Sequence, residues 1–393
     1  MNDQQRSAHI LPVIVIAQFC CTSLWFAPNG VMSELISTYD LPNTALGHLT
    51  SVVQFGFILG TLVFAIMMIA DRISPSKVFF ICAVIGSFFN LAALYPGNSL
   101  TSLLVERGCV GFFLAGIYPV GMKIAADYYQ TGLGRSLGYL VGALVLGTAF
   151  PHIILSFFGT SVPWEGVIIS SSALAFLGGL TMFILVQDGP YRRASSAFDA
   201  GTIPRVFKDP SFRSAAFGYF GHMWELYAFW AFVPIMLTAF GEIHPQQIDN
   251  HSLLAGIIIG VGSLSCIFGG ELSNRYDTRK LARLFLLASF ICCLLSPLIF
   301  QIQSTFIFIT FLIFWGLVVI ADSPLFSSLV AGHAPASSKG TALTIVNCIG
   351  FAITIVSIQL LTSLVGRMEF KYMFVMLAIG PALGLLALRN KES

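Results

Sequence analysis

Long apolar runs alternate with short polar segments along the whole chain. A helix needs about 20 predominantly apolar residues to cross the hydrocarbon core of a bilayer. Twelve runs are long enough, near residues 9–33, 46–70, 77–95, 99–126, 135–158, 165–187, 213–240, 252–273, 281–301, 304–331, 340–364 and 370–388. This pattern predicts an all-α membrane protein with twelve transmembrane helices.

The longest polar stretch lies in the middle of the chain and separates two sets of six runs. A short repeat relates the two sets, because Ile69–Arg72 after the second run is echoed by Leu272–Arg275 after the eighth, 203 residues later. Two similar halves around a midplane cavity are an architecture used for alternating access. We therefore predict three parts, an N-terminal six-helix half over 1–187, a linker over 188–212 and a C-terminal six-helix half over 213–393.

Composition agrees with a chain surrounded by lipid. Of the 393 residues, 56% are hydrophobic and 10% are charged, which leaves too little polar surface for a water-soluble globule. All eight cysteines fall inside apolar runs, where a thiol behaves as a small hydrophobe, so neither a disulfide nor a thiolate metal site is expected. We expect a monomer in the bilayer, with no nucleic-acid partner, no metal and no cofactor.

The positions of the charges predict the orientation. If both termini are cytoplasmic, two of the twenty Lys and Arg residues (Arg367 and Lys371) lie in outer loops, and two (Arg107 and Lys123) lie within the fourth run. The other sixteen lie in inner segments: Arg6, Arg72, Lys77, Arg135, Arg192, Arg193, Arg205, Lys208, Arg213, Arg275, Arg279, Lys280, Arg283, Lys339, Arg389 and Lys391. The positive-inside rule favours this orientation. We predict a multi-pass protein of the cell inner (plasma) membrane.

Ionisable side chains at membrane depth are the candidates for chemistry, because each costs a few kcal/mol or more unless it is paired or hydrated. His222 and Glu225, at spacing i, i+3 in the seventh run, share one helix face, and Tyr219 lies on the same side one turn earlier. Asp322 lies deep in the tenth run, where Pro324 removes a backbone hydrogen bond beside the acid. Each acid could instead fix helix packing.

Further polar side chains in other runs are candidates for a transport pathway. Arg107 in the fourth run is a fixed cation that could hold an anionic substrate or act on a nearby acid, or that could form a structural salt bridge. Trp25 and Asn29 in the first run and Asn347 in the eleventh could line a central cavity. Aromatic and amide side chains are also common in helix contacts.

The chain resembles the major facilitator superfamily over nearly its whole length. The family's loop motif, Gly-x-Leu-Ala-Asp-Arg-x-Gly-Arg-Arg/Lys, is similar to the segment from Gly270 to Lys280, and an eroded copy keeps Ala70-Asp71-Arg72. The resemblance implies a gating role for four residues of these loops: Asp71, Arg72, Asn274 and Arg275. The segment from Arg107 to Gly111 looks like the family's Arg-x-x-x-Gly motif, which is often linked to proton coupling.

Two more segments bear on the branch of the family and on the direction of transport. The glycines of the fifth run, with Pro151, are similar to an exporter motif but lack its closing part. The segments Tyr118–Lys123 and Gly221–Tyr227 look like a bacterial branch grouped with nitrate/nitrite and cyanate carriers. Nitrate carriers place an arginine in the second and eighth helices, and this chain has none in either, so the grouping does not carry over a substrate.

These patterns favour a secondary active transporter that moves a small organic solute by alternating access. Phosphate-loop and His-Glu-x-x-His motifs are absent from the sequence. This excludes ATP hydrolysis by a phosphate loop and zinc-dependent catalysis by a His-Glu-x-x-His pair. His222, Glu225, Asp322 and Arg107 favour proton coupling, and a sodium site at Asp322 is the alternative. Uptake by symport and export by antiport of a drug or metabolite both stay open. A non-transporting receptor or scaffold is the alternative from another class.

Overall fold

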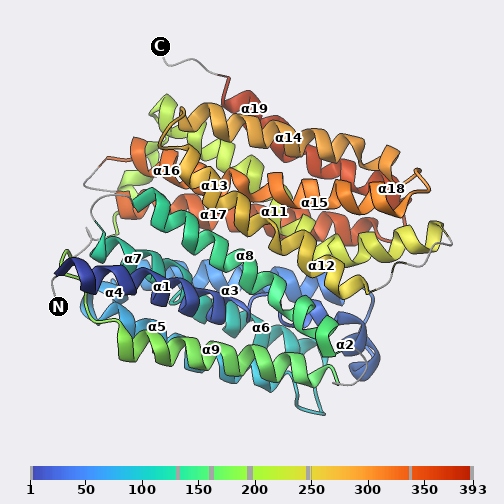
Figure 1. The fold of residues 1–393 in the computed structure, drawn as a ribbon, viewed down its shortest axis with the longest axis horizontal. Helices are drawn as coiled ribbons and strands as arrows, with labels where there is room; N and C mark the ends of the chain where they lie inside the picture. The colour runs from blue at the N-terminus through green and yellow to red at the C-terminus, as the bar shows by residue number, and fades with distance from the viewer. Residues whose placement is uncertain are drawn as a thin grey trace.

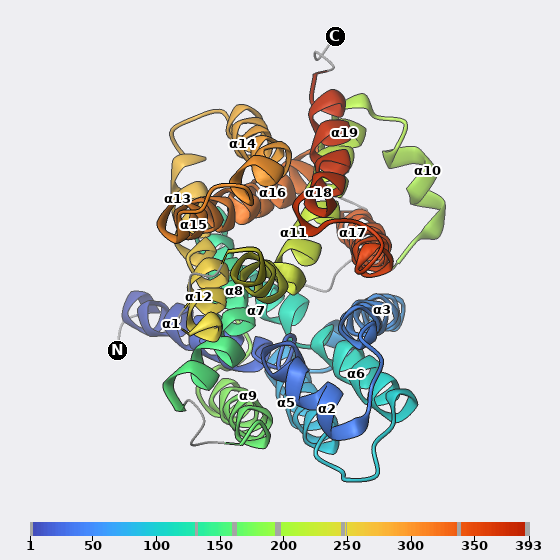
Figure 2. The same cartoon turned by 90° about the vertical axis from the view of Figure 1, so that its right-hand side faces the viewer.

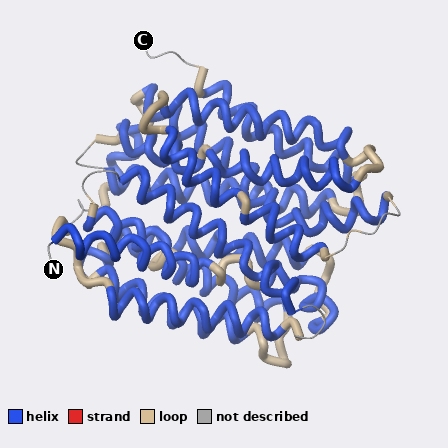
Figure 3. Tube along the Cα trace, in the orientation of Figure 1, coloured by secondary structure: helices blue, strands red, loops and turns tan. Residues whose placement is uncertain are grey.

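The computed structural model of the chain describes residues 3–129, 133–158, 163–192, 198–244, 248, 250–335 and 339–389. Helices make up the regular structure of these residues, and the described ranges contain no strand (Figure 3). The prediction of an all-α membrane fold is therefore confirmed. Arg6 lies in a described helix without a described side chain, while Arg193 and Lys391 of the charge pattern lie outside the described residues.

The helices before the linker form one group, which we call the N-half. Its elements are α1 (Asp3–Thr22), η1 (Pro28–Val31), α2 (Met32–Tyr39), α3 (Ala45–Ile66), α4 (Ile69–Arg72), α5 (Pro75–Ala92), α6 (Leu100–Leu114), α7 (Tyr118–Tyr128), α8 (Leu133–Phe158) and α9 (Glu165–Leu185). The linker contributes η3 (Ala200–Thr202) and α10 (Ile203–Val206).

The helices after the linker form the second group, the C-half. Its elements are α11 (Pro210–Ile243), α12 (His251–Gly260), α13 (Gly262–Leu272), α14 (Thr278–Ile299), α15 (Thr305–Ala321), α16 (Ser323–His333), α17 (Lys339–Leu364), α18 (Phe370–Met373), η5 (Phe374–Ala378) and α19 (Ile379–Ala387). The two groups lie side by side when the molecule is viewed along its helices (Figure 2).

Both chain termini lie at one end of the molecule, together with the segment between α9 and α11 (Figure 1). We call this the linker end, and we call the opposite end, where α2 and α18 lie, the far end. Eleven helical segments among the described residues are long and apolar enough to cross a membrane. The first helix contains a shorter apolar segment, His9–Thr22.

Several runs that the sequence predicts as continuous helices are interrupted. The predicted run 99–126 breaks between α6 and α7, and the run 304–331 breaks at Asp322. Pro119 and Pro324 lie in the first turn of the helices that follow these breaks. Proline lacks the N–H that would continue the preceding helix, so each run is divided in two. The first predicted run, 9–33, likewise ends as a helix at Thr22 and resumes at η1.

The internal repeat of the sequence recurs in the packing. Gly111 of α6 lies against the carbonyl group of Val53 in α3, and Gly316 of α15 lies against the carbonyl group of Ile258 in α12. Each residue of the first contact is 205 positions before its counterpart in the second, the same separation as that of Pro119 and Pro324. Equivalent helices of the two halves therefore cross at equivalent points.

Two sets of helix contacts join the halves. The first set is α3 with α17, and the second is α8 with α12 and α13. Glycines of the predicted exporter motif permit the second contact, because a Cβ on Gly138 would lie 3.0 Å from the carbonyl oxygen of Cys266, and one on Gly142 would lie 3.2 Å from that of Ser263. Small residues let helices approach closely where lipid provides no hydrophobic drive.

Candidate functional site

A buried acid lies at the break between α15 and α16. Asp322 is 1% exposed, and its Oδ1 lies 2.8 Å from Nδ1 of His222 on α11, which is also 1% exposed. The break permits this contact because it ends α15 inside the protein rather than at a membrane surface. Two residues that the sequence singles out in different runs are thus brought together as one buried pair.

Glu225, one turn after His222, has a different set of partners. Its carboxylate accepts hydrogen bonds from Nε1 of Trp315 at 2.6 Å, from the hydroxyl group of Ser289 at 2.8 Å and from the thiol of Cys293 at 3.3 Å. Ser289 and Cys293 lie on α14, and Trp315 lies on α15. Glu225 therefore ties three helices of the C-half together, and its predicted part in proton coupling stays a prediction.

The His222–Asp322 pair is close to the surface where the halves meet. Cys266 of α13 lies with its thiol 3.8 Å from the carbonyl oxygen of Ile320, two residues before Asp322, and its backbone lies against Gly138 of α8 in the N-half. Gly269 of α13 lies against the carbonyl group of Ala321, the residue before Asp322. Among the described residues, Nε2 of His222 has no hydrogen-bond partner. One ring nitrogen is therefore available to a proton, a water molecule or a solute.

Aromatic rings from both halves meet at Tyr227, on the same helix as His222. Phe351 of α17 lies 4.5 Å from Phe57 of α3 and 5.7 Å from Trp25, where distances join ring centroids. The Trp25 and Phe351 planes are 23° apart, and Tyr227 of α11 lies 5.8 Å from Trp25 and 5.3 Å from Phe351. We call Trp25, Phe57, Tyr227 and Phe351 the aromatic cluster. All four rings are buried.

The polar residues predicted to line a cavity form pairs around the aromatic cluster. Tyr219 donates a hydrogen bond from its hydroxyl group to Oδ1 of Asn347 at 3.1 Å, so two residues predicted separately for the cavity are in contact. Nε1 of Trp25 donates to Oε1 of Gln54 at 3.2 Å, and Asn29 donates to the hydroxyl group of Thr50 at 2.9 Å. Their roles in transport stay predictions.

Arg107 lies apart from these groups, inside the N-half. Its guanidinium group donates to the carbonyl oxygens of Leu24 at 2.9 Å and Trp25 at 2.7 Å, just after α1 ends, and to Oδ1 of Asn90 at 3.0 Å. Both carbonyl groups lie in the segment between α1 and η1, and buried carbonyl groups require a hydrogen-bond partner. Arg107 therefore holds the backbone of Trp25, while its predicted part in proton coupling stays a prediction.

A cleft separates the two halves at the linker end. Its volume is about 160 Å³, and its walls come from α3, α7 and the start of α17, with Phe198 of the linker. Asp71 and Lys123 line it as an ion pair, with 3.0 Å between Oδ1 and Nζ. Thr61 of α3 also lines the cleft, and its buried hydroxyl group has no hydrogen-bond partner among the described residues.

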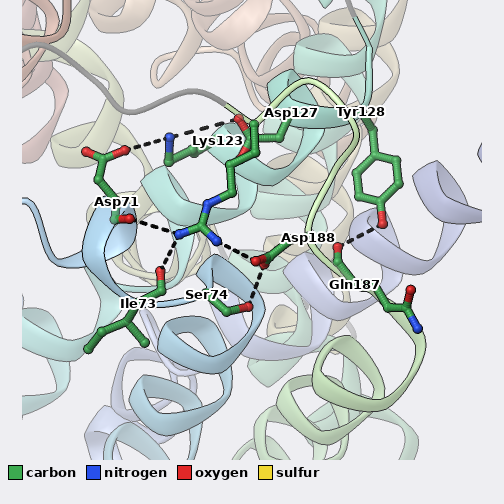
Figure 4. Close-up of polar contacts among 9 residues, drawn as sticks. Asp71, Ile73, Ser74, Lys123, Asp127, Tyr128, Gln187 and Asp188 are labelled. Atoms are coloured by element: carbon green, nitrogen blue, oxygen red, sulfur yellow. Dashed lines mark hydrogen bonds and ion pairs between the residues drawn. The ribbon is translucent and has the colours of Figure 1, made fainter.

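The first turn of the linker is fastened to the N-half beside this cleft (Figure 4). Arg192 forms an ion pair with Asp188 and donates to the carbonyl oxygens of Asp71 and Ile73 at 2.9 and 3.0 Å. The amide group of Tyr191 donates to the carbonyl oxygen of Asp127 at 3.0 Å. Asp71 is thus part of a network within its own half, and its predicted gating role stays a prediction.

The other predicted gating residues lie at the surface of the linker end. The side chains of Arg72, Asn274 and Arg275 are exposed. The ion pair that joins the halves near them is Arg135–Glu271, with 3.5 Å between Nε and Oε1. Glu271 belongs to the same predicted loop motif as Asn274. The gating roles of Arg72, Asn274 and Arg275 stay predictions.

Sequence reasoning misses three contributors to these sites. Trp315 and Ser289 reach Glu225 from helices in which neither residue stands out among apolar or hydroxyl neighbours. Gln54 is a polar residue in the middle of an apolar run, and that signal could have identified it as a partner of Trp25. The pairings across helices depend on how the helices rotate against one another, which a single sequence does not specify.

Comparison with known proteins agrees with this architecture. The sequence profile of the Major Facilitator Superfamily matches residues 14–358. Purine ribonucleoside efflux pumps named NepI are similar in sequence. The one from Shigella boydii is 20% identical over 226 residues, which cover 56% of this chain and 55% of that protein, so the chain spans about half its length. The one from Escherichia coli O6:H1 is 19% identical over 304 residues, which cover 76% of this chain and 72% of that protein.

Solved structures with the same fold cover nearly the whole chain. A bacterial homologue of the human lysosomal transporter Spinster, in an inward-facing and unoccupied conformation, superposes with a TM-score of 0.72 at 16% identity, over 98% of this chain and 97% of that one. The proton:xylose symporter XylE bound to 6-bromo-6-deoxy-D-glucose superposes with a TM-score of 0.78 at 12% identity, over 98% and 95%. At these identities the likeness establishes the fold alone.

Proposed function

Because the chain belongs to the major facilitator superfamily and is therefore a membrane transporter rather than an enzyme, we propose that it is a proton-driven carrier of a small planar organic solute. In this proposal the carrier works as a monomer in the cell inner membrane, and the linker end faces the cytoplasm. The two halves open in turn to either side of a central site at the aromatic cluster. The observation that carries the proposal is the buried His222–Asp322 pair, whose histidine lies on α11, the helix that also carries Tyr227 of the cluster.

The proton site in this proposal is Asp322 with His222. Removing a carboxyl group from water favours its protonated form, and readmitting water favours the ionised form. Asp322 ends α15 at a break next to the inter-half surface, so movement of the halves changes its access to water. His222 stabilises the ionised carboxylate at 2.8 Å, and its Nε2 is directed away from Asp322. Proton binding at the pair is thereby linked to which side is open.

Glu225 has a supporting part in the proposed mechanism. Its three partners are all donors from inside the C-half, so the carboxylate is held in place by groups that do not separate when the halves move. It fixes α11 against α14 and α15, and these helices present His222 and Asp322 to each other. We therefore propose Glu225 as a positioning residue for the proton site.

The aromatic cluster supports a planar solute. Trp25 and Phe57 come from the N-half, and Tyr227 and Phe351 come from the C-half, so the rings must separate when the site opens. A flat ring that enters between them can replace their mutual contacts, since aromatic pairs contribute about 0.5–1.5 kcal/mol beyond their burial. Gln54 bonds to Trp25 through its Oε1, and its buried Nε2 has no partner among the described residues, so it can donate to a polar heterocycle between the rings.

The efflux pumps that resemble this chain suggest where to begin. They are named for purine ribonucleosides, which combine a planar base with polar edges, and we propose this class as the first to test. Their names also favour export. In our proposal, proton entry drives that export. Uptake by symport is the alternative direction. A sodium ion at Asp322 is the alternative coupling ion, but the Nδ1 atom of His222 already lies against that carboxylate.

Transport by the purified full-length protein in liposomes tests the proposal. Vesicles are loaded with labelled adenosine, and release is followed with an imposed pH gradient, with an equal sodium gradient, or with neither. The proposal predicts that release accelerates when the medium outside the vesicles is more acidic than the lumen, which stands for the cytoplasm. An ionophore that collapses this gradient should abolish the acceleration, and unlabelled nucleosides should inhibit release. Movement that follows the sodium gradient, or that ignores both gradients, would contradict proton coupling. Proton-driven movement of xylose but not adenosine would contradict the substrate class.

A further inference from the structure

At the far end one side chain of α17 binds to α3 across the boundary between the halves. The side-chain amide of Gln359 donates hydrogen bonds to the carbonyl oxygen of Gly47 at 3.0 Å and to the hydroxyl group of Ser51 at 2.8 Å. Gly47 and Ser51 are one helical turn apart on α3, so the amide bridges two successive turns of the opposing helix. Ser51 is buried, and Gln359 is half-buried.

The two helices are in direct contact at this point. Gly47 lies against Thr362, three residues after Gln359, so closely that a Cβ on Gly47 would overlap the Thr362 side chain. A glycine is required for this approach because any larger residue would push α17 away from α3. The carbonyl group of Gly47 is consequently within reach of Gln359.

The same helices separate toward the linker end. Thr61 and Phe64 of α3 face Thr341 and Thr344 of α17 across the cleft of about 160 Å³. One pair of helices is therefore closed at the far end and parted at the linker end. The hydrogen bonds of Gln359 belong to the closed end.

We propose that Gln359 is the latch of the far-end gate and that its bonds to Gly47 and Ser51 stabilise the state in which the far end is closed. This inference rests on alternating access in the proposed function, but not on the solute or the coupling ion. Opening the far end must break both bonds at once, because both acceptors lie on α3. Water can then solvate the freed groups, so the latch biases the equilibrium without locking it.

Two spin-label pairs report the two ends of the molecule. Cysteines replacing Asn43 and Arg367, both exposed, flank the far-end contact, and cysteines replacing Lys77 and Lys339, also exposed, flank the linker end. The background carries Cys109→Ala, since the other seven native cysteines are buried. Distances are measured by pulsed electron resonance in lipid nanodiscs.

The latch predicts a population shift. Gln359→Ala should increase the ratio of far-end-open to far-end-closed molecules about tenfold, which lengthens the Asn43–Arg367 distance and shortens the Lys77–Lys339 distance. Ser51→Ala removes one acceptor and should give a smaller shift in the same direction. Gln301→Ala is the matched control, because Gln301 is an exposed far-end glutamine whose amide bonds to the carbonyl oxygen of Pro297 in its own half.

A steric variant tests the same gate without touching Gln359. Gly47→Ala should force the far end apart, and Thr362→Gly in addition should restore the closed distance, because it removes the overlapping side chain. Distances that stay at wild-type values in both Gln359→Ala and Gly47→Ala would overturn the latch. Failure of adenosine transport in the wild type would overturn the proposed substrate instead. The distance measurements do not use the solute, so their outcome does not depend on that result.

Discussion

Replacing Glu225 distinguishes a positioning residue from a proton carrier. In Glu225→Gln the amide oxygen can keep the bonds from Trp315 and Cys293, which both reach Oε1. The amide nitrogen then faces Ser289, whose single hydroxyl hydrogen can turn to the carbonyl oxygen of Leu286 at 3.1 Å and leave the hydroxyl oxygen to accept a bond. Glutamine therefore fits the site with one bond reversed, whereas Glu225→Leu leaves the Trp315 N–H without an acceptor.

The expected magnitudes follow from these bonds. Exchanging hydrogen bonds to a charged acceptor for neutral ones should cost Glu225→Gln about 1 kcal/mol of unfolding free energy. Glu225→Leu should lose about 1–3 kcal/mol more, because a buried indole N–H and a thiol remain unpaired. In both variants the hydroxyl group of Ser289 still has a hydrogen-bond acceptor, the carbonyl oxygen of Leu286, so it adds no unpaired group.

Two measurements on the same preparations decide between the roles. Unfolding is titrated with a denaturing detergent in mixed micelles, and transport is assayed in liposomes with and without a pH gradient. A positioning residue predicts that Glu225→Gln keeps proton-driven transport with wild-type pH dependence, and that Glu225→Leu loses stability and transport together. If Glu225→Gln unfolds like the wild type but no longer responds to the pH gradient, Glu225 is the coupling acid and our assignment is refuted.

Three further predictions concern the gate, the solute and the orientation. Asp71→Ala removes one of the two carboxylates that Lys123 pairs with, the other being Asp127, and so loosens a wall of the cleft; a cysteine replacing Thr344 should then react faster with a water-soluble thiol reagent from the linker end, and an unchanged rate would argue against a gating role for Asp71. Phe351→Ala removes three ring contacts and should weaken adenosine binding several-fold by calorimetry with little change in pH dependence, whereas unaltered binding would place the solute elsewhere. A cysteine replacing exposed Asn250 should react with an impermeant reagent outside intact cells and one replacing exposed Lys208 should not, and the reverse pattern would invert the topology.

The fold was predictable because its determinants are local. Each apolar run is about as long as a bilayer is thick, and no alternative satisfies the backbone in lipid. The prolines at the two breaks, Pro119 and Pro324, are visible in the sequence. The hydrophobic pattern alone does not tell whether a proline kinks a membrane helix or divides it. The predicted continuous runs therefore give way to paired short helices at these points.

The site was predictable only as a set of separate residues. The free-energy cost of an ionisable side chain at membrane depth identified His222, Glu225 and Asp322 as candidates. That cost does not say which of them contact each other. His222 and Glu225 share a helical face, which suggests a joint role, yet the neighbouring helices give one of them Asp322 and the other Trp315. Gln359 and Ser51 are ordinary polar residues in apolar runs, and they acquire a role only because α17 lies against α3.

The central claim is that Asp322, paired with His222, carries the coupling proton. Asp322→Asn keeps the size of the side chain and removes its exchangeable charge. With one proton per solute, a gradient of one pH unit sustains about a tenfold solute gradient in the wild type. The claim predicts that Asp322→Asn sustains none, while exchange of labelled for unlabelled adenosine without a gradient persists. An Asp322→Asn carrier that still builds a tenfold gradient in the same liposomes would contradict it.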